Sequence, residues 1–568
     1  MSVTDTLRAY AAYAAVPAAI WSFFLPVVQL IGIYKIFRYY SSPPPKAVSP
    51  TLDKDKIPHI TIIRPVKDLE PRLYECLAST FRQDYPRDKL TLRFCVDDEG
   101  DPAYPLLERL LGDFPGFDAR ILVEEYDPVL NDPEHPTKLG PNPKIRNVSR
   151  AYREAKGDDL IWIIDCNVWI GRGVAGRMVD KLEGYAPGGK RVKPYKFVHQ
   201  LPLVVDISGV EEHGSQAEGA GAPRSERWTW RDVWARGGGR LEEMFMATTH
   251  AKFYSAINTV GVAPCIVGKS NMFRKAHLDR YTDPGENPHL RPQDAERGRG
   301  IDFFSSYICE DHLIGDLLWR APIPGHRNHG LVFGDLAVQP MAGMPVGAYW
   351  GRRVRWLRVR KWTVMAATLV EPCVESLVYN LLCSFALTTI PGLFPGLHIP
   401  PVPLSGPSCW LLGVSIWMVV DRIVYRKLHA CQSVEVDENT PAFAMGTSHP
   451  GGAHLRPLSE WLPAWFGREI LALPIWTWAV LLGTTVTWRK KHFRVMPNMS
   501  VVAIDKVSKA QASRMSPELP PSSNGYDSKS QNGGLGVQRP KARTVASGRE
   551  SVSARRRHQY SGNGAATE

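Results

Sequence analysis

The chain has 568 residues, too many for one ordinary domain, and 44% of them are hydrophobic. Its formal net charge is +12, but roughly half of that excess lies after residue 505, so attraction to a membrane surface explains the basic balance better than binding to nucleic acid. The nine cysteines show no paired CxxC spacing, which argues against a zinc site and against a disulfide framework.

The first apolar segment predicts an N-terminal transmembrane anchor over residues 1–40. No charged residue occurs from Ala9 to Tyr34, which is long enough to cross a bilayer and longer than the apolar core of a cleavable signal peptide. Arg8 precedes the segment, whereas Lys35 is the first of several cations after it, so the positive-inside bias places the following chain in the cytosol. A buried helix of a soluble protein is the alternative.

Residues 57–350 alternate short strand-like runs with longer amphipathic ones. The strand-like runs are "HITIIRPV", "LTLRFCV", "DARILVEE" and "LIWIID", and the helix-like runs between them are "LYECLASTFRQ", "YPLLERLLGDF" and "KIRNVSRAYREAK". This rhythm predicts an α/β domain with a mixed, mainly parallel, Rossmann-like sheet. Stretches rich in Gly, Pro and charge near 206–240 and 283–300 are interpreted as insertions. The absence of a Gly-rich phosphate loop argues against a dehydrogenase or a P-loop enzyme.

Acidic residues follow two of the predicted strands. The sequence "DDEGD" begins at Asp97, after one strand, and "DCN" begins at Asp165, after another. Ligands of parallel sheets bind beyond the carboxyl ends of the strands, and hard cations that bridge a diphosphate prefer oxygen ligands such as those of Asp165 and Asn167. Cys166 is a poor ligand for magnesium. For a single Asp in such a place, a helix N-cap is the alternative.

Residues 351–495 predict an interfacial helix and C-terminal membrane helices. The charge-free run Ser376–Val420 is interrupted by Pro and Gly, which is typical of a helical hairpin. A further uncharged run, Ile470–Trp488, stops at "RKKHFR", a flank typical of a cytosolic membrane edge. An anchor, a hairpin and one more span would leave this flank outside, so at least one segment is expected to re-enter or to lie in the interface. Glu371 and Glu375 are expected on one helix face, near the cytosolic surface or facing protein.

The tail, residues 500–568, is rich in Ser, Gly, Asn and Arg with few large apolar side chains, and it is predicted to be disordered.

The chain resembles the ceramide glucosyltransferase family, membrane-anchored inverting enzymes that act on UDP-glucose and have a GT-A type domain. The resemblance rests on "RPVKDLEPRLYECLASTFRQDYP", "CVDDEGDPA", "NPKIRNV", "DLIWIIDCNV", "CIVGKSNMFRK", "ICEDHLIGDLL" and "RRVRW". The three aspartates of the family fall on Asp101, Asp165 and Asp311, and its RxxRW or QxxRW element falls on Arg352, Arg355 and Trp356. The resemblance implies glucosyl transfer to the C1 hydroxyl of ceramide in the Golgi or endoplasmic reticulum membrane, with the catalytic domain facing the cytosol.

The resemblance also implies a role for each residue. Asp311 is expected to be the base that takes the proton of the acceptor hydroxyl, with Glu310 as the alternative. The residues expected to bind the nucleotide sugar are Asp98, Asp101, Lys144, Asp165, Arg352 and Arg355, the two arginines on the leaving diphosphate. Asp165 and Asn167 are expected to hold a divalent metal ion, Mg²⁺ or Mn²⁺; the wider fold often carries a second Asp where this chain has Asn167.

The acceptor is expected to meet His250 and Trp356, although His250 is equally well explained as a structural histidine and Lys144 as a surface lysine. Cys265 matches a family cysteine near the nucleotide pocket, with simple packing as the alternative. The later cations of "GRRVRWLRVRKW", Arg358, Arg360 and Lys361, are expected to contact anionic membrane lipids.

Three rival functions stay open at this point: a processive polysaccharide synthase, a transferase to another membrane lipid such as dolichyl phosphate or a sterol, and a non-enzymatic membrane scaffold. A synthase would need more membrane helices to form a channel than this chain offers. The decisive expectation is spatial, because the assigned chemistry requires Asp165 and Asp311 to lie in the same cleft.

Overall fold

The computed structural model describes residues 3–131, 139–208, 229–393, 402–489 and 491–504, all within one unit that spans Met1–Asp505. The tail from residue 505, residues 209–228 of the first expected insertion and residues 394–401 of the expected hairpin lie outside the described residues.

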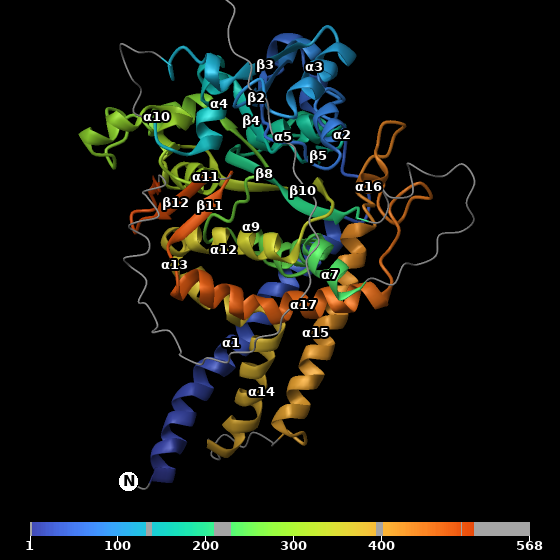
Figure 1. Ribbon diagram of the computed structural model, residues 1–568, viewed down its shortest axis with the longest axis vertical. Coiled ribbons are helices and arrows are strands. Elements are labelled where there is room, and N and C mark those ends of the chain that lie inside the picture. Colours follow the sequence, from blue (N-terminus) through green and yellow to red (C-terminus); the bar gives the residue numbers. More distant parts are fainter. Residues whose placement is uncertain (1–2, 132–138, 209–228, 394–401, 490, 505–568) are drawn as a thin grey trace, which may run out of the picture. The chain divides into compact units, whose positions relative to one another are not determined.

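An eight-stranded sheet forms the centre of the domain (Figure 1). Its strands are β1 (Ile60–Pro65), β2 (Leu90–Val96), β3 (Asp118–Val123), β4 (Leu160–Ile164), β5 (Trp169–Ile170), β8 (Tyr195–Asp206), β9 (Ser270–Arg274) and β10 (Arg327–Met341), in the order β3-β2-β1-β4-β9-β8-β10-β5. The first four strands in this order pair in parallel, as do β8 and β10, whereas β9 and β5 run antiparallel to their neighbours. The predicted mixed α/β class is therefore confirmed.

The sheet is buried on both faces, which explains why its central strands are almost entirely apolar. On one face, Ile62 and Trp162 pack with helices α2 (Leu73–Ala78), α3 (Tyr104–Asp113) and α5 (Val174–Glu183). On the other face, Ile63 and Ile161 pack with α4 (Pro143–Glu154), α10 (Lys275–Tyr281) and α11 (Glu310–Arg320). The helices expected from the sequence are present here as α2, α3 and α4.

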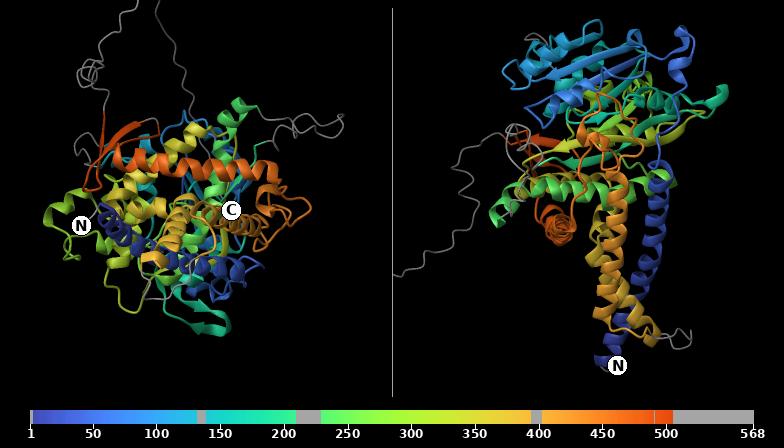
Figure 2. Two further views of the ribbon diagram at one scale, coloured as in Figure 1. Left: turned by 90° about the horizontal axis from the view of Figure 1, so that it is seen from below. Right: turned by 90° about the vertical axis from the view of Figure 1, so that its right-hand side faces the viewer.

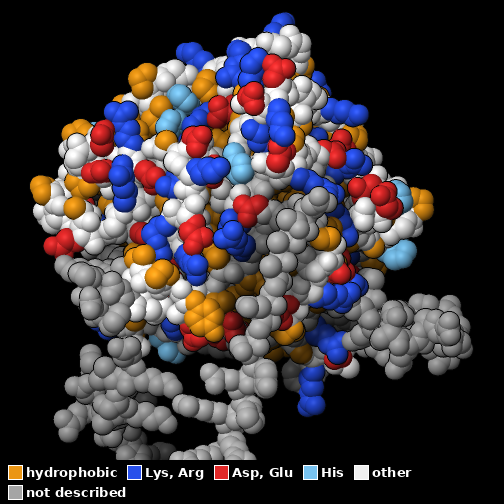
Figure 3. All heavy atoms as spheres, turned by 90° about the horizontal axis from the view of Figure 1, so that it is seen from above, with side chains coloured by type: hydrophobic (Ala, Val, Ile, Leu, Met, Phe, Trp, Pro, Cys, Tyr) orange, Lys and Arg blue, Asp and Glu red, His pale blue; other side chains and the backbone are white. Residues whose placement is uncertain are grey.

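Further helices lie between the sheet and the lower part of the molecule in Figure 1. They are α7 (Trp230–Arg236), α8 (Gly238–Phe245), a π-helical turn (Met246–His250), α9 (Ala251–Val260), α12 (Val346–Thr363), α13 (Met365–Val370), the short turn Glu371–Val374 and α17 (Leu458–Trp476). The face above the sheet carries interspersed cationic and anionic side chains (Figure 3).

Three helices run side by side away from the sheet: α1 (Val3–Tyr39), α14 (Ser376–Leu393) and α15 (Gly406–His429) (Figures 1 and 2). Ala9–Tyr39 and Gly406–His429 are long and apolar enough to cross a membrane, and the bent pair Met365–Val374 and Ser376–Gly392 adds a third span if it counts as one. A Cβ atom on Gly32 would collide with the Lys252 carbonyl, so glycine lets α1 pack closely on α9. The chain is therefore a membrane-associated protein.

The uncharged run Ile470–Trp488 is not a membrane span. Its first half belongs to α17, which also contains the buried Arg468 and Glu469, and its end forms strand β11 (Thr485–Trp488). Figure 1 shows α17 crossing between the sheet and the three lower helices. Among the described residues, α17 is not one of the helices long and apolar enough to cross a membrane.

Residues 491–494, the end of the basic run "RKKHFR", lie in a small sheet. β11, β12 (Lys491–Val495) and β13 (Val501–Ala503) pair in antiparallel order, and we call them the C-terminal sheet. Val501 donates its backbone N–H to the carbonyl of Ser306, so the predicted tail begins after this strand and not at residue 500. Tertiary pairing gives these residues a structure that their polar composition does not predict.

Candidate active site

Asp165 lies directly after β4, where two lysines hold its carboxylate. Lys144 Nζ is 3.2 Å from Oδ1, and Lys269 Nζ is 3.1 Å from Oδ2. Lys269 reaches it because β9, which it precedes, pairs with β4 so that Ser270 lies opposite Ile164. Burial alone would disfavour the charged carboxylate, but the two ammonium groups outweigh burial and hold the pKa of Asp165 well below its usual range. Asp165 is therefore ionised at any physiological pH.

Lys144 joins this carboxylate to the start of α11. Asn142, the N-cap of α4, accepts from the backbone N–H groups of Lys144 and Ile145 and so fixes the first turn of the helix. Lys144 Nζ lies 3.1 Å from Glu310 Oε1, and Asn142 Nδ2 donates to Glu310 Oε2 at 3.1 Å. Burial opposes the charge on Lys144, yet the surrounding carboxylates raise its pKa above the ordinary value. Lys144 is a buried, permanently charged lysine and not the ordinary surface lysine of the alternative interpretation.

Asp311 lies near Asp165 and lines a pocket together with Lys144 and Glu310. Its carboxylate packs against Gly268, where a Cβ atom would collide with Oδ2, and the next residue, Lys269, is bound to Asp165. Burial raises the pKa of Asp311 and the charge of Asp165 raises it further, whereas Lys144 lowers it. The two aspartates are therefore close enough to interact electrostatically, and a cleft that they share stays a prediction.

Glu310 and Asp311 differ in how their carboxylates are occupied. Glu310 is held by Asn142 and Lys144, whereas no side chain in the described part of the chain donates a hydrogen bond to the carboxylate of Asp311. Burial raises the pKa of Glu310 as well. Asp311 therefore has the carboxylate that is freer to meet an acceptor hydroxyl.

The carboxylates in the acidic turn after β2 differ in how many contacts they make with the rest of the protein. Asp101 is 2% exposed and accepts from the backbone N–H groups of Asp68 and Ala103, and Lys67 lies 2.9 Å from its Oδ2. Asp97 is 3.4 Å from the same lysine. Asp98 is half-buried and makes no ion pair with the described residues. The Asp101 carboxylate therefore stabilises the turn. Of the two residues in this turn that are expected to bind the donor, only Asp98 has a carboxylate without such contacts.

Two arginines of α12, Arg352 and Arg355, lie near these residues and differ in whether a carboxylate pairs with them. Arg352 Nε donates to the fully buried carboxylate of Glu242 at 2.9 Å, and its guanidinium lies 4.8 Å above the ring of Trp356. Arg355 makes no ion pair with any described carboxylate and stacks 5.7 Å from the ring of Trp488. Burial, followed by the charge of Arg352, lowers the pKa of Arg355 to about 10, so it remains charged at neutral pH.

The two residues expected to meet the acceptor lie beside Phe245. The His250 ring centroid is 5.7 Å from that of Phe245 and 5.0 Å from that of Tyr254, and the buried His250 Nδ1 has no hydrogen-bond partner. Burial, then the nearby arginines Arg353 and Arg360, lower the pKa of His250 to about 3, so the ring is neutral. Trp356 packs at the edge of the cluster that contains Phe245. Cys265 packs at the edge of another apolar cluster.

The lipid contacts expected for Arg358 and Lys361 are wrong. The Arg358 guanidinium donates to the carbonyls of Thr485 and Trp478, and Lys361 Nζ donates to the carbonyl of Val480 at 3.1 Å. Trp478 and Val480 belong to the helical turn Thr477–Leu481, whose last carbonyls lack partners within the helix, and Thr485 begins β11. Arg360 pairs with Glu371 at 3.1 Å and keeps 43% of its side chain exposed.

Three residues near the cleft were not anticipated: Lys269, Trp488 and Arg489. Arg489, in the turn of the C-terminal sheet, lies 3.5 Å from Asp97 and is 15% exposed. Ile308, just before α11, packs with Val359 of α12 and Phe493 of the C-terminal sheet, so that sheet is built against both catalytic elements. The sequence "CIVGKSNMFRK" could have indicated Lys269, because it places a lysine just before a strand.

The residues around Asp165 fit a metal ion only in part. No group of three or more His, Cys, Asp and Glu side chains among the described residues is placed to hold an ion. Asn167 Oδ1, however, is buried without a hydrogen-bond partner two residues from Asp165. Magnesium is commonly bound by one or two carboxylates together with substrate phosphates. This pair therefore fits a cation that a diphosphate also coordinates, and not a site made by the protein alone.

Comparison with known proteins supports an enzymatic interpretation. The family model described as glycosyl transferase family 21 matches residues 23–211 and 235–501. A ceramide glucosyltransferase of Pyricularia oryzae is 57% identical over 86% of this chain and 95% of its own length, and one of Gibberella zeae is 49% identical over 86% and 93%. One of Komagataella phaffii is 32% identical over 86% and 91%. A solved mannosyltransferase of Pyrobaculum calidifontis aligns over 74% of this chain and 98% of its own at a TM-score of 0.33 and 16% identity, too weak a likeness for any conclusion.

Proposed function

The chain belongs to glycosyl transferase family 21, and we propose that it transfers glucose from UDP-glucose to the C1 hydroxyl of ceramide with inversion, giving β-glucosylceramide and UDP. The observation that supports this proposal is the cluster of charges in which Lys144 pairs with both Asp165 and Glu310 at the start of α11, with Asp311 beside them. Inverting transfer is one displacement, which needs a base on the acceptor side and positive charge on the leaving-group side.

The donor's diphosphate binds on the cationic side of the cleft. Lys144, Lys269 and Arg355 supply the positive charge there, with Arg352 next to them. The uridine lies towards the turn after β2, where Asp98 is open, Asp101 fixes the backbone and Arg489 approaches from the C-terminal sheet. Arginine suits this role because its planar donors can bind two phosphate oxygens at once.

Asp165 and Asn167 are the residues that would hold a divalent ion at the donor. When bound there, the ion neutralises charge on the leaving group. The orphaned Asn167 Oδ1 supports this assignment, and Asp165 supports it because its carboxylate is kept ionised.

Asp311 accepts the proton of the acceptor hydroxyl as that oxygen attacks the anomeric carbon. Burial raises its pKa, which makes it a stronger base than an exposed carboxylate. His250 and Trp356 form the acceptor side of the site, beside Phe245.

The membrane helices hold the cleft near the lipid surface. We place the catalytic domain on the cytosolic side of the Golgi or endoplasmic reticulum membrane, because cations are concentrated immediately after the first span. The apolar face of α17, with Phe466, Ile470 and Leu473 exposed, lies in the interface. Protection of the catalytic domain from protease added outside sealed microsomes would contradict this orientation.

The function is tested by supplying purified protein with several UDP-sugars and lipid acceptors. Glucosylceramide with a β linkage, identified by mass spectrometry and by the anomeric proton coupling, is the expected product. A different lipid product, a polymer, or release of UDP without glycolipid would overturn the proposal.

A further inference from the structure

The tight turn of the C-terminal sheet lies against the edge of the central sheet. Trp488 pairs with Lys491 at one end of β11 and β12, so Arg489 belongs to the turn that joins these two strands. The Nη1 atom of Arg489 lies 3.5 Å from Oδ1 of Asp97, the first residue after β2. Ligands of α/β sheets bind beyond the carboxyl ends of the strands. The turn therefore meets the central sheet at the edge where a ligand is expected.

The charge of Arg489 also reaches the end of a second strand. Burial raises the pKa of the Cys166 thiol to about 11, and Arg489 is one of the cations that lower it. Cys166 follows Asp165 after β4, and β1 lies between β4 and β2 in the sheet. Because neighbouring strands lie about 4.8 Å apart, the ends of β2 and β4 are separated by roughly 10 Å. Arg489 therefore acts on both sides of the end of β1.

The backbone of Arg489 has a conformation that arginine rarely adopts. Its φ angle is 47°, in the left-handed region, where a Cβ atom is unfavourable and where tight hairpin turns usually place Gly, Asn or Asp. A residue strained in this way persists when its surroundings hold it, and such residues cluster at ligand-binding sites. Glycine would suit this turn better, so the stability of the turn does not explain an arginine there.

The residue before Arg489 faces the diphosphate side of the donor site. The Arg355 guanidinium lies 5.7 Å from the ring centroid of Trp488, and Arg355 is one of the cations expected to bind the diphosphate. Trp488 and Arg489 are adjacent, so the turn connects the diphosphate side with the acidic turn after β2, where the uridine is expected. A cation between these two sides faces the phosphate next to the ribose, because that phosphate joins the nucleoside to the rest of the diphosphate.

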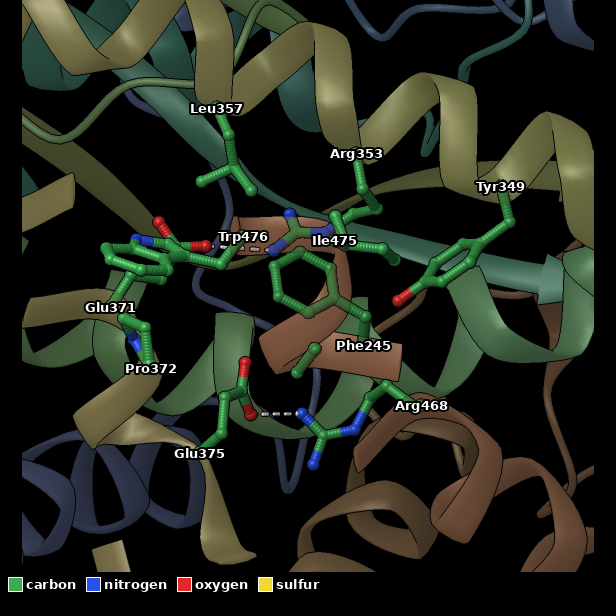
Figure 4. Close-up of a pocket in the computed structure, with 11 residues that line it drawn as sticks. Phe245, Tyr349, Arg353, Leu357, Glu371, Pro372, Glu375, Arg468, Ile475 and Trp476 are labelled. Atoms are coloured by element: carbon green, nitrogen blue, oxygen red, sulfur yellow. Dashed lines mark hydrogen bonds and ion pairs between the residues drawn. The ribbon is translucent and has the colours of Figure 1, made fainter. Parts of the chain in front are cut away.

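Helix α12, which carries Arg355, is anchored on its opposite face. Arg353 and Arg360 of this helix both pair with Glu371, at 2.9 Å and 3.1 Å, and Glu375 pairs with an arginine of α17 at 2.6 Å (Figure 4). Glu371 and Glu375, expected on one helix face, instead flank the bend of 78° before α14. Residues two apart on a helix point to nearly opposite sides, so these pairs fix α12 from the side away from Arg355. The turn of the C-terminal sheet thus faces a helix that is held in place.

We propose that the turn of the C-terminal sheet forms one wall of the donor site, in which Arg489 binds the phosphate next to the ribose of the nucleotide. The inference rests on the proposed function for the presence of a nucleotide sugar, and it adds which part of that donor Arg489 contacts. Apart from Asp97, no described side chain accepts a hydrogen bond from Arg489, so most of its five N–H donors are left for a ligand. Hydrogen bonds between a guanidinium and a phosphate are among the strong ones.

The test replaces Arg489 with the residue that its backbone conformation favours. Arg489→Gly should weaken the binding of both UDP and UMP about tenfold, measured by titration of the purified protein without acceptor, because both carry the phosphate next to the ribose. Inhibition by uridine, which has no phosphate, should weaken by less than about twofold. The unfolding midpoint should stay equal or rise, since glycine adopts a left-handed φ without strain. Arg494→Ala removes an exposed cation of β12 and should bind UDP as wild type does.

The proposal fails if R489G binds UMP as tightly as wild type, or if uridine loses as much affinity as UMP. A loss of UMP affinity that comes with a lowered unfolding midpoint would make Arg489 a structural residue and would also contradict the proposal. Arg489→Lys keeps the charge and should recover part of the lost affinity. Wild-type protein that binds UDP but makes no glucosylceramide would defeat the proposed function, whereas turnover together with unchanged UMP binding in R489G would defeat only this contact.

Discussion

Exchanging the two adjacent carboxyls at the start of α11 separates base chemistry from electrostatic support. Asp311→Asn removes the carboxylate that packs against Gly268 and receives no side-chain hydrogen bond from the described residues, and Glu310→Gln removes the one that pairs with Lys144 at 3.1 Å. Both substitutions keep the size of the side chain. Any difference between them therefore reports the role of the charge and not a change in packing.

A general base contributes about 10²–10⁴-fold to a rate, so D311N should lower kcat by that factor with both KM values little changed. Glu310 makes one charged pair and one hydrogen bond, and loss of a charge-assisted bond costs about 1.5–3 kcal/mol, chiefly in folding stability. E310Q should therefore show a lowered unfolding midpoint and a rate within about tenfold of wild type.

The assay measures initial rates of glucosylceramide formation with each substrate varied, and thermal unfolding is followed on the same preparations. The reasoning is refuted if E310Q loses as much kcat as D311N while its unfolding midpoint is unchanged. It is also refuted if D311N keeps more than about a tenth of the wild-type kcat, since a lost base should cost more.

Three further perturbations test the rest of the site. Lys144→Met removes a charge that lowers the pKa of Asp311. Because the base must be ionised, the acidic limb of the kcat–pH profile should move to higher pH. An unmoved limb would show that Lys144 does not act on the base. Chelation with EDTA should abolish activity and added Mg²⁺ or Mn²⁺ restore it, with Asn167→Ala requiring more metal; full activity in EDTA would remove the metal from the proposal. Arg489→Ala should raise KM for UDP-glucose about tenfold while Arg494→Ala, on an exposed position of β12, does not; equal effects would place Arg489 outside the donor site.

Local patterns predicted the central strands and the position of Asp165 directly after one of them. The β-branched runs around Ile62 and Ile161 are typical of doubly covered strands, and polar residues directly after such strands are expected at a ligand-binding edge. The assignment of Asp311, by contrast, depended on resemblance to a family. Its neighbour Glu310 has the same local sequence features, and only the contacts with Asn142 and Lys144 separate the two.

Residues brought in by antiparallel pairing could not be predicted from local sequence. Lys269 reaches Asp165 because β9 pairs with β4 across more than a hundred residues of chain, and nothing near either residue specifies that register. Arg358 carries the composition of a lipid-facing cation, yet it binds carbonyls at the end of a distant helix. Composition describes what a side chain can bind, whereas tertiary packing decides which partner it meets.

Among the cations expected to bind the diphosphate, Arg355 differs from Lys144 and Lys269 because no described carboxylate pairs with it. Lys144 and Lys269 are both paired with Asp165, so bound diphosphate must compete with that carboxylate for them. Arg355 has no such competitor: it carries its charge beside the ring of Trp488 and makes no ion pair with any described carboxylate. Burying a cation without a partner is costly, and burial lowers the pKa of Arg355 to about 10. An arriving diphosphate relieves that cost, which gives the cleft affinity for the donor before any chemistry begins.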